Sequence, residues 1–280
     1  MRISLAQVAP QLGDIDANLK TSERLVNDAT ADGSELVVFP ELSLSGYSVG
    51  NVEHDPAMGA DDQRLAALSR ACGDVGILVG FPEISEGLHV YNSMVFLQDG
   101  EVLHTHRKVY LPSYATFEER NHFSPGNRMR AFPTPHGRMA VLTCNDAWQP
   151  QLAFIAVQDA ARVLLIPTCS PETPPGTPWD AHEYWHGITR FYARMFQVYV
   201  VFANRVGSEG DLSFWGGSHV VDPWGEVIAE AAMNQEELLT VDIDLQRVRE
   251  RRREVPLVKE AKLAMLQREL SRLADSGGDL

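Results

Sequence analysis

The sequence predicts an α/β fold in which helices cover layers of β-sheet, because short apolar strand patterns alternate with helical patterns along its length. The segment Leu36–Phe39 is apolar at every position, which is typical of a strand covered on both faces. Asp99-Gly100, between two strand-like segments, predicts a tight hairpin. No linker-like gap interrupts the alternation. We therefore expect a single domain over residues 1–280, with 245–280 forming a charged, helical C-terminal arm.

In the first half of the chain, strands are expected where apolar residues alternate or run together, and helices where they recur three and four residues apart. The expected strands are Ile3–Val8, Leu36–Phe39, Gly76–Phe81, Tyr91–Gln98 and Glu101–Arg107. The expected helices are Asp16–Ala31 and Asp61–Cys72. A long irregular stretch is expected at about 109–127.

The second half is richer in strands. They are expected at Met139–Thr143, Val163–Pro167, Val198–Ala203, Trp215–Val221, Val227–Ala231 and Leu239–Ile243. One helix is expected between the first two of these strands, and another after a proline-rich loop at 171–178. In that second helix Ile188, Phe191, Tyr192, Met195 and Phe196 recur at helical spacing, so we expect them on a buried face.

Composition excludes several classes of protein. A net charge of −14 argues against a nucleic-acid partner, which requires a basic face. No uncharged run approaches the ~20 residues that span a bilayer, and the N-terminal residues lack the apolar core of a signal peptide. Three widely spaced cysteines indicate reduced thiols rather than a disulfide framework. We expect a cytoplasmic protein that binds neither nucleic acid nor membrane.

Three apolar segments each end at an ionisable residue: Glu41, Lys108 and Cys144. Singly, each has an ordinary explanation, as a solvated loop carboxylate, a lysine reaching to the surface, and a small buried thiol. Together, a carboxylate, an ammonium and a thiol at the ends of core strands can form a base, an oxyanion clamp and a nucleophile. This combination predicts a hydrolase with a covalent intermediate.

The segments around these residues resemble the motifs of the nitrilase, or carbon–nitrogen hydrolase, superfamily. Phe39–Tyr47 resembles its glutamate motif, Arg107–Pro112 its lysine motif and Cys144–Asp146 its nucleophile motif. Phe117–Gly126 resembles the segment that carries a second glutamate, with Glu119 as the better match. Further matches are Tyr91–Ser93, Asn204–Gly207, Gly216–Ser218 and Asp222–Glu226. The resemblance covers nearly the whole chain.

This resemblance implies a four-layer αββα sandwich and assigns roles to four residues. Cys144 would be the nucleophile, Glu41 the general base, Lys108 the oxyanion-stabilising cation and Glu119 a substrate-orienting carboxylate. The sulfur would form a thioester with the acyl group, and water would then cleave it. Such chemistry requires no metal and no organic cofactor.

The residues after the nucleophile bear on the substrate. Asn145-Asp146 stands where true nitrilases usually carry Trp-Glu, which favours amides over nitriles. The expected activity is cleavage of a non-peptide C–N bond in a small amide or N-carbamoyl amine, with release of ammonia or amine. The alternatives are a nitrilase, a stand-alone glutaminase-like amidase and, in another class, a catalytically silent binding protein. Asp146 would either support catalysis or cap a helix with a free carboxylate.

Four residues are expected to bind the substrate: Tyr47, Asn145, Trp148 and Cys169. By resemblance, the backbone N–H of Asn145 would contact the oxyanion. Cys169 follows a strand and would line the pocket, with inert packing as the alternative. Trp179, Tyr184 and Trp185 would extend an aromatic wall with Trp148, or lie in the core. Specificity would depend on loops near 47–60, 113–125 and 170–190.

A competing motif is His182-Glu183-Tyr184-Trp185-His186, which matches the H-E-x-x-H signature of zinc hydrolases. In a helix both imidazoles would lie on one face, with Glu183 as the base. The sequence provides no evident third ligand, so we expect no metal site.

The C-terminal arm suggests self-association. Leu263, Leu266, Leu270 and Leu273 are spaced three, four and three residues apart, which gives an apolar seam too short for an isolated coiled coil. The seam must pack on its own domain or on another copy, and we expect a homodimer or a larger homo-oligomer. Ser276–Asp279 resembles the start of the ATP-pyrophosphatase loop that follows glutaminase domains in some synthetases, but we expect it to be a polar tail.

Overall fold

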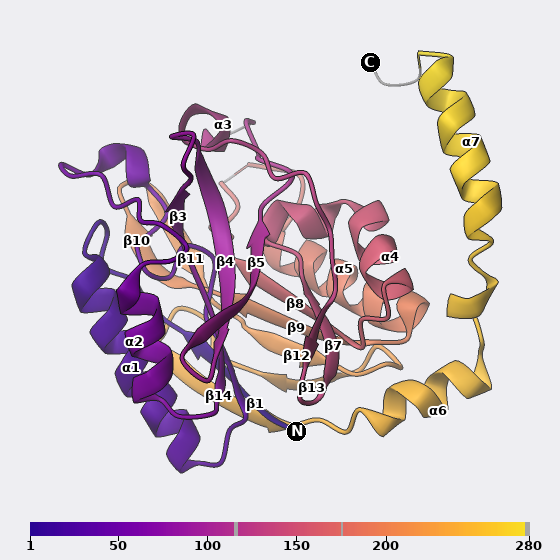
Figure 1. Ribbon diagram of the computed structural model, residues 1–280, viewed down its shortest axis with the longest axis horizontal. Helices are drawn as coiled ribbons and strands as arrows, with labels where there is room; N and C mark the ends of the chain where they lie inside the picture. The colour runs from indigo at the N-terminus through magenta and orange to yellow at the C-terminus, as the bar shows by residue number, and fades with distance from the viewer. Residues whose placement is uncertain (115–116, 175, 278–280) are drawn as a thin grey trace.

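The computed structural model, which describes residues 1–114, 117–174 and 176–277, contains two six-stranded mixed sheets (Figure 1). The first sheet has the order β14-β1-β2-β3-β4-β5. Its strands are β1 (Arg2–Gln7), β2 (Leu36–Val38), β3 (Gly76–Ile84), β4 (Val90–Gln98), β5 (Glu101–Arg107) and β14 (Glu237–Asp242).

The second sheet has the order β13-β12-β9-β8-β7-β6. Its strands are β6 (Phe132–Thr134), β7 (Gly137–Val141), β8 (Val163–Thr168), β9 (Tyr199–Asn204), β12 (His219–Val221) and β13 (Val227–Glu230). A separate ribbon pairs β10 (Val206–Glu209) with β11 (Leu212–Trp215).

Helices cover the outer face of each sheet. Apolar residues of α1 (Ile15–Ala31) and α2 (Gln63–Ala71) pack against the first sheet. Those of α4 (Pro150–Gln158) and α5 (Ala181–Phe196) pack against the second. Between the sheets, Leu5, Val38 and Leu78 meet Val141, Leu165 and Val201 in a third apolar cluster. The expectation of a four-layer αββα sandwich is confirmed.

Strand direction brings the candidate residues to one edge of the sandwich. In the first sheet β1, β2 and β3 are parallel, and β5 returns to the direction of β3 because two antiparallel pairings separate them. Glu41 follows β2, and Lys108 follows β5. In the second sheet β7, β8 and β9 are parallel, with Cys144 after β7. Ligand sites of α/β sheets lie at such carboxyl ends.

Most expected elements are present, and the Asp99-Gly100 hairpin is confirmed by φ angles of 53° and 80°. The expected single strand Trp215–Val221 is wrong. Gly216 and Gly217 adopt φ angles of 76° and 60°, which turn the chain and separate β11 from β12. The short strands β6 and β10 were not expected.

The expected buried face of α5 is partly wrong. Tyr192 is buried and Ile188 and Phe196 are partly buried, but Phe191 and Met195 are 49% and 45% exposed. The buried residues of this helix are Ala181, Trp185, Thr189, Tyr192 and Ala193. The stripe that faces the sheet is therefore rotated about the helix axis, away from Phe191 and Met195.

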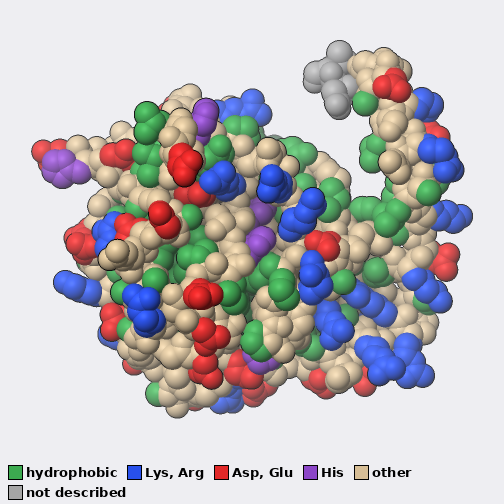
Figure 2. Space-filling model, in the orientation of Figure 1, with side chains coloured by type: hydrophobic (Ala, Val, Ile, Leu, Met, Phe, Trp, Pro, Cys, Tyr) green, Lys and Arg blue, Asp and Glu red, His purple; other side chains and the backbone are tan. Residues whose placement is uncertain are grey.

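The C-terminal arm comprises α6 (Gln246–Glu254), η3 (Val258–Glu260) and α7 (Leu263–Asp275). In Figure 1, α7 stands away from the sandwich, and none of its residues is buried. Lys and Arg side chains gather over α6 and α7 in Figure 2. Of the expected polar tail at 276–279, residues 278 and 279 lie outside the described residues. None of the helices in the described part of the chain is long and apolar enough to cross a membrane.

Candidate active site

Glu41 lies in the interior, where its carboxylate accepts three hydrogen bonds. Oε1 accepts from Lys108 Nζ at 2.7 Å and from Asn92 Nδ2 at 2.7 Å. Oε2 accepts from the backbone N–H of Cys169 at 2.9 Å. A carboxylate without solvent contact requires such partners, and these donors come from both sheets. The carboxylate is therefore held in one orientation.

Lys108 bridges two carboxylates. Its Nζ lies 2.7 Å from Glu41 Oε1 and 2.7 Å from Glu119 Oε1, and the side chain is fully buried. Burial alone would lower the pKa of Lys108, but the charges of Glu119 and Glu41 outweigh it and raise this pKa well above its usual value. Lys108 is thus a fixed cation, suited to stabilising negative charge.

Glu119 lies at the start of α3 (Glu119–His122), within the stretch expected to be irregular. Its Oε1 also accepts a hydrogen bond from the Tyr47 hydroxyl at 2.9 Å. Burial raises the pKa of Glu119 to about 7, with Lys108 opposing this shift and Glu41 adding to it. Its second oxygen, Oε2, is buried and has no hydrogen-bond partner among the described residues. That oxygen can accept from a bound molecule.

Cys144 begins the short 3₁₀ helix η2 (Cys144–Trp148) with a φ angle of 44°, in the left-handed region that non-glycine residues seldom adopt. Its side chain is buried, and burial raises the pKa of the thiol well above its usual value. The charge of Glu41 acts in the same direction, and that of Lys108 opposes it. The resting group is a thiol, so its attack requires a base.

Asp146 connects the nucleophile turn to the lysine segment. Its Oδ1 accepts from the backbone N–H groups of Val109 and Tyr110 at 3.0 and 2.9 Å, and its Oδ2 lies 2.8 Å from His106 Nε2. The side chain is fully buried, so the alternative of a free carboxylate is wrong, but Asp146 does take part in the cap of η2, where its Oδ2 accepts from the backbone N–H of Thr143 at 3.3 Å. Asp146 also fixes the residues after Lys108 against the turn that carries Cys144.

A pocket of about 460 Å³ opens at Cys144. Asn145 and Trp148 line it, together with Trp179, Tyr184 and Trp185. Trp148 stacks on Tyr184 with ring centroids 5.7 Å apart, and it meets Trp179 and Trp185 edge-on at 6.2 and 5.8 Å. The other lining residues are Pro112, Tyr114, Phe117, Ser170, Pro171, Glu172, Thr173 and Pro174.

Tyr47 and Cys169 are not among the described residues that line this pocket, and neither are Glu41, Lys108 and Glu119. Tyr47 donates to Glu119, with which it lines a second cavity of about 420 Å³, and the backbone N–H of Cys169 donates to Glu41. The Cys169 thiol also donates to the Glu41 carbonyl at 3.0 Å. Both residues therefore help to hold a carboxylate in position.

Sequence reasoning assigned no role to Asn92 or Glu172. Asn92 holds Glu41, and its place in a recognised motif was the only sequence signal. Glu172 lies in the proline-rich loop, where a single acidic residue carries no pattern. It is the only acidic residue that the described part of the chain contributes to the lining, which includes no Arg or Lys.

Comparison with known proteins gives a consistent result. A carbon-nitrogen hydrolase family model matches residues 2–253. The omega-amidase NIT2 of Danio rerio is 32% identical over 269 residues, which are 92% of this chain and 94% of the relative. The N-carbamoylputrescine amidase of Arabidopsis thaliana is 28% identical over 255 residues, or 85% of each protein.

A third relative is longer than this chain. The glutamine-dependent NAD(+) synthetase of Thermotoga maritima is 34% identical over 251 residues, which are 88% of this chain and 42% of the synthetase. The chain thus spans less than half of that relative.

A solved structure is similar over most of both chains. A mutant of the amidase from Nesterenkonia sp. AN1, with acrylamide added at its active-site cysteine, superposes with a TM-score of 0.76. It is 25% identical, and the match covers 91% of this chain and 98% of the amidase. The family match over residues 2–253 and the similarity to an omega-amidase over most of both proteins show that this chain belongs to the carbon–nitrogen hydrolase family of the nitrilase superfamily.

Proposed function

We propose that this protein is a cytoplasmic thiol amidase that cleaves a small amide or N-carbamoyl amine through a thioester on Cys144. The observation that carries the proposal is the group of buried charged residues around the Cys144 thiol. Cys144 lies at the pocket surface, and the charges of Glu41, Lys108 and Glu119 all act on its thiol. Amidases are among its similar proteins, which supports the same assignment.

In the first half of the reaction, Glu41 takes the thiol proton as sulfur attacks the carbonyl carbon. The tetrahedral oxyanion is stabilised by the Lys108 ammonium and the backbone N–H of Asn145. Asn145 is the second residue of η2, and the first N–H groups of a helix have no acceptor within it. Protonated Glu41 then donates to the departing nitrogen, which leaves as ammonia or an amine.

In the second half, Glu41 takes a proton from water as the water oxygen attacks the thioester carbon. Lys108 and the Asn145 N–H stabilise the second oxyanion in the same way, and the cysteine sulfur leaves with the proton from Glu41. Each step uses protein groups and water only, and the enzyme returns to its starting protonation state.

Glu119 supports an amide substrate. Its buried Oε2 has no partner within the described residues, so it can accept a hydrogen bond from a carboxamide or carbamoyl NH₂. A nitrile offers no such donor. Binding a nitrile would leave a buried acceptor unpaired, which is the kind of mismatch that enzymes reject strongly.

The pocket walls support a neutral or cationic group on the rest of the substrate. Glu172 is the acidic residue that lines the pocket, and the described lining includes no basic residue to pair with a carboxylate. Trp148, Trp179 and Tyr184 present aromatic surface beside it, which attracts a cation as well as an apolar chain. An N-carbamoyl amine with a second, protonated amine fits this environment better than an ω-amidodicarboxylate.

A panel of matched substrates tests these assignments. By kcat/KM, an amide should be hydrolysed at least ~100-fold better than the nitrile with the same side chain, which corresponds to about 2.7 kcal/mol of transition-state preference. Within the amides and N-carbamoyl amines, compounds with an ammonium tail should exceed equally long compounds with a carboxylate tail. Ammonia and amine release measures both ratios.

The variant Glu172→Gln provides the control for tail charge, because it removes the charge and keeps the shape. It should reduce the preference for the ammonium tail and leave the amide-to-nitrile ratio unchanged. If nitriles match amides in the wild-type protein, the role of Glu119 and the amidase assignment both fail. If Glu172→Gln leaves the tail preference unaltered, the cationic assignment fails alone.

We also propose that the protein is a homodimer or a larger homo-oligomer, with the C-terminal arm in the contact. Leu263, Leu270 and Leu273 of α7 are 53%, 65% and 44% exposed, so they do not pack on the sandwich. Light scattering at micromolar concentration should give a mass of at least two chains. Removal of the exposed seam by Leu270→Glu should lower that mass, and a stable wild-type monomer would contradict the proposal.

A further inference from the structure

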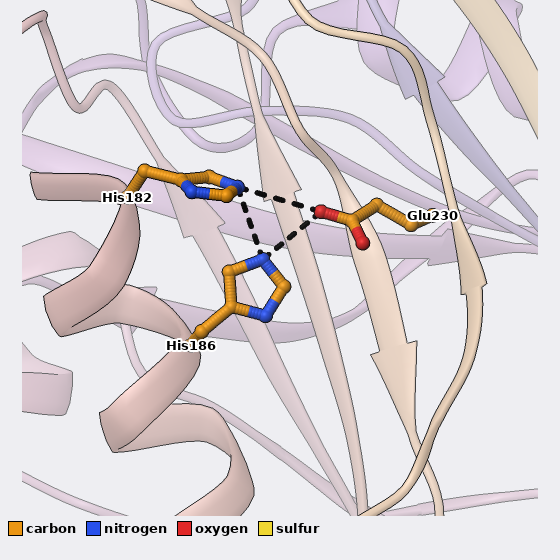
Figure 3. Close-up of side chains that lie close together, drawn as sticks. All are labelled: His182, His186 and Glu230. Carbon is orange, nitrogen blue, oxygen red and sulfur yellow. Dashed lines mark hydrogen bonds and ion pairs between the residues drawn. The ribbon is translucent and has the colours of Figure 1, made fainter.

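His182, His186 and Glu230 form a cluster on the outer side of the second sheet, apart from the residues assigned to catalysis. The two histidines are one turn apart on α5, and Glu230 is the last residue of β13. Figure 3 shows both imidazoles directed at the carboxylate across the gap between helix and strand. His182 and Glu230 are 37% and 38% exposed at their side chains and His186 is 19% exposed, so solutes can reach the cluster.

The three nearest ligand atoms lie at the spacing of a metal-coordination polyhedron. His186 Nε2 lies 3.1 Å from His182 Nε2 and 2.9 Å from Glu230 Oε1, and His182 Nε2 lies 3.5 Å from the same oxygen. Four ligands at 2.0–2.1 Å around a tetrahedral Zn²⁺ are about 3.3 Å apart. The observed triangle is close to one face of such a tetrahedron.

When both imidazole rings are neutral, their N–H groups cannot satisfy every hydrogen-bond acceptor in the cluster. If His186 Nε2 carries a proton, it can donate to His182 Nε2 or to Glu230 Oε1, but one N–H cannot serve both fully. The remaining lone pairs then face one another. A cation at the centre of the triangle removes this repulsion.

Neighbouring groups hold the two rings in position. His186 stacks on His219 with ring centroids 4.3 Å apart, and His182 meets Trp215 edge-on at 5.0 Å. His219 is itself fixed, because its Nε2 lies 2.9 Å from the Thr189 hydroxyl. Ligands that are oriented before binding lose little freedom when a metal enters.

We propose that His182, His186 and Glu230 bind a divalent transition metal ion of the Zn²⁺ class. Two imidazole nitrogens and one carboxylate oxygen are ligands that Zn²⁺ accepts readily, and water completes the coordination. The sequence offered no evident third ligand, and the fold brings Glu230 to this position from 44 residues beyond His186. The site differs from a zinc hydrolase in that Glu183 is exposed and lies outside the cluster.

Metal binding connects α5 to β13, and α5 also contributes Tyr184 and Trp185 to the pocket wall. The ion would therefore stabilise the position of the pocket wall, whereas the covalent chemistry stays with Cys144. We expect loading to alter the KM of the substrate more than its kcat.

Titration of chelator-treated protein with Zn²⁺ tests the site directly. Zn²⁺ also binds thiolates, so each sample is first alkylated at Cys144 with iodoacetamide. Calorimetry and elemental analysis should give one tight Zn²⁺ per chain, and Zn²⁺ should raise the melting temperature. Outer-sphere partners of metal ligands contribute ~10–100-fold to affinity, so loss of a direct ligand in His186→Ala or Glu230→Gln should weaken binding at least tenfold.

Glu183→Gln is the matched control, since it removes a carboxylate from the same helix without touching the cluster. Its affinity for Zn²⁺ should equal that of the wild type. The melting temperature of each variant without Zn²⁺ shows whether it is folded. No Zn²⁺ binding by folded wild-type protein, or equal binding by folded Glu230→Gln, overturns the proposal. Loss of binding in Glu183→Gln would overturn the assignment of Glu230.

Discussion

Cys144→Ala should reduce turnover of every substrate by on the order of 10⁴-fold or more, because the thiol forms the covalent bond of both half-reactions. The remaining groups would still bind and polarise the carbonyl group, but they offer no nucleophile. The substitution removes one buried sulfur from the start of η2, so the variant should fold. Ammonia release and circular dichroism check these two expectations.

Cys72→Ala is the matched control for this variant. Cys72 is also a free, buried cysteine, but it caps α2 in the outer layer, where burial raises the pKa of its thiol to about 11. Its replacement should leave kcat unchanged. Substantial activity in folded Cys144→Ala protein would end the thioester mechanism, whichever substrate is used.

Lys108→Met should lower kcat by on the order of 10² or more, the usual effect of removing an oxyanion donor. Methionine keeps much of the side-chain volume but removes the charge between Glu41 and Glu119. Two buried carboxylates without a shared cation favour protonation, so the variant also weakens the base. Steady-state kinetics, corrected for the folded fraction, measure the loss.

Arg107→Met provides the comparison at the adjacent position. Arg107 pairs with Glu83 at 2.6 Å rather than with the catalytic carboxylates. This variant should retain most of the wild-type kcat. An effect of Lys108→Met confined to KM would instead make Lys108 a substrate-binding residue.

The sequence was sufficient to predict the layers, and it singled out four charged or nucleophilic residues that the structure brings near one another. Strands such as β2 and β8 are recognisable as short runs of mostly apolar residues. Glu41, Lys108 and Cys144 each lie just after such an apolar segment. The side of α5 that faces the sheet was less predictable. Phe191 and Met195 are apolar yet exposed, because apolar spacing does not distinguish a helix face that meets the sheet from one beside it.

Contacts between distant segments could not be predicted. Asp146 receives three of its partners from 106–110, and nothing in its own sequence neighbourhood indicates those three. Tyr47 was assigned to the substrate as part of the glutamate motif and Cys169 because it follows a strand, but sequence does not determine whether a residue contacts the substrate or a buried carboxylate. Glu230 was within an expected strand, and only the fold brings it to His186.

The most direct test of the mechanism is the mass of the enzyme during turnover. Wild-type protein mixed with excess substrate and quenched in acid should carry an added acyl group, equal to the substrate minus ammonia or amine. Peptide mapping should locate this group on Cys144, and Cys144→Ala should not acquire it. Sustained turnover without any adduct, or an acyl group on a different residue, would contradict the account.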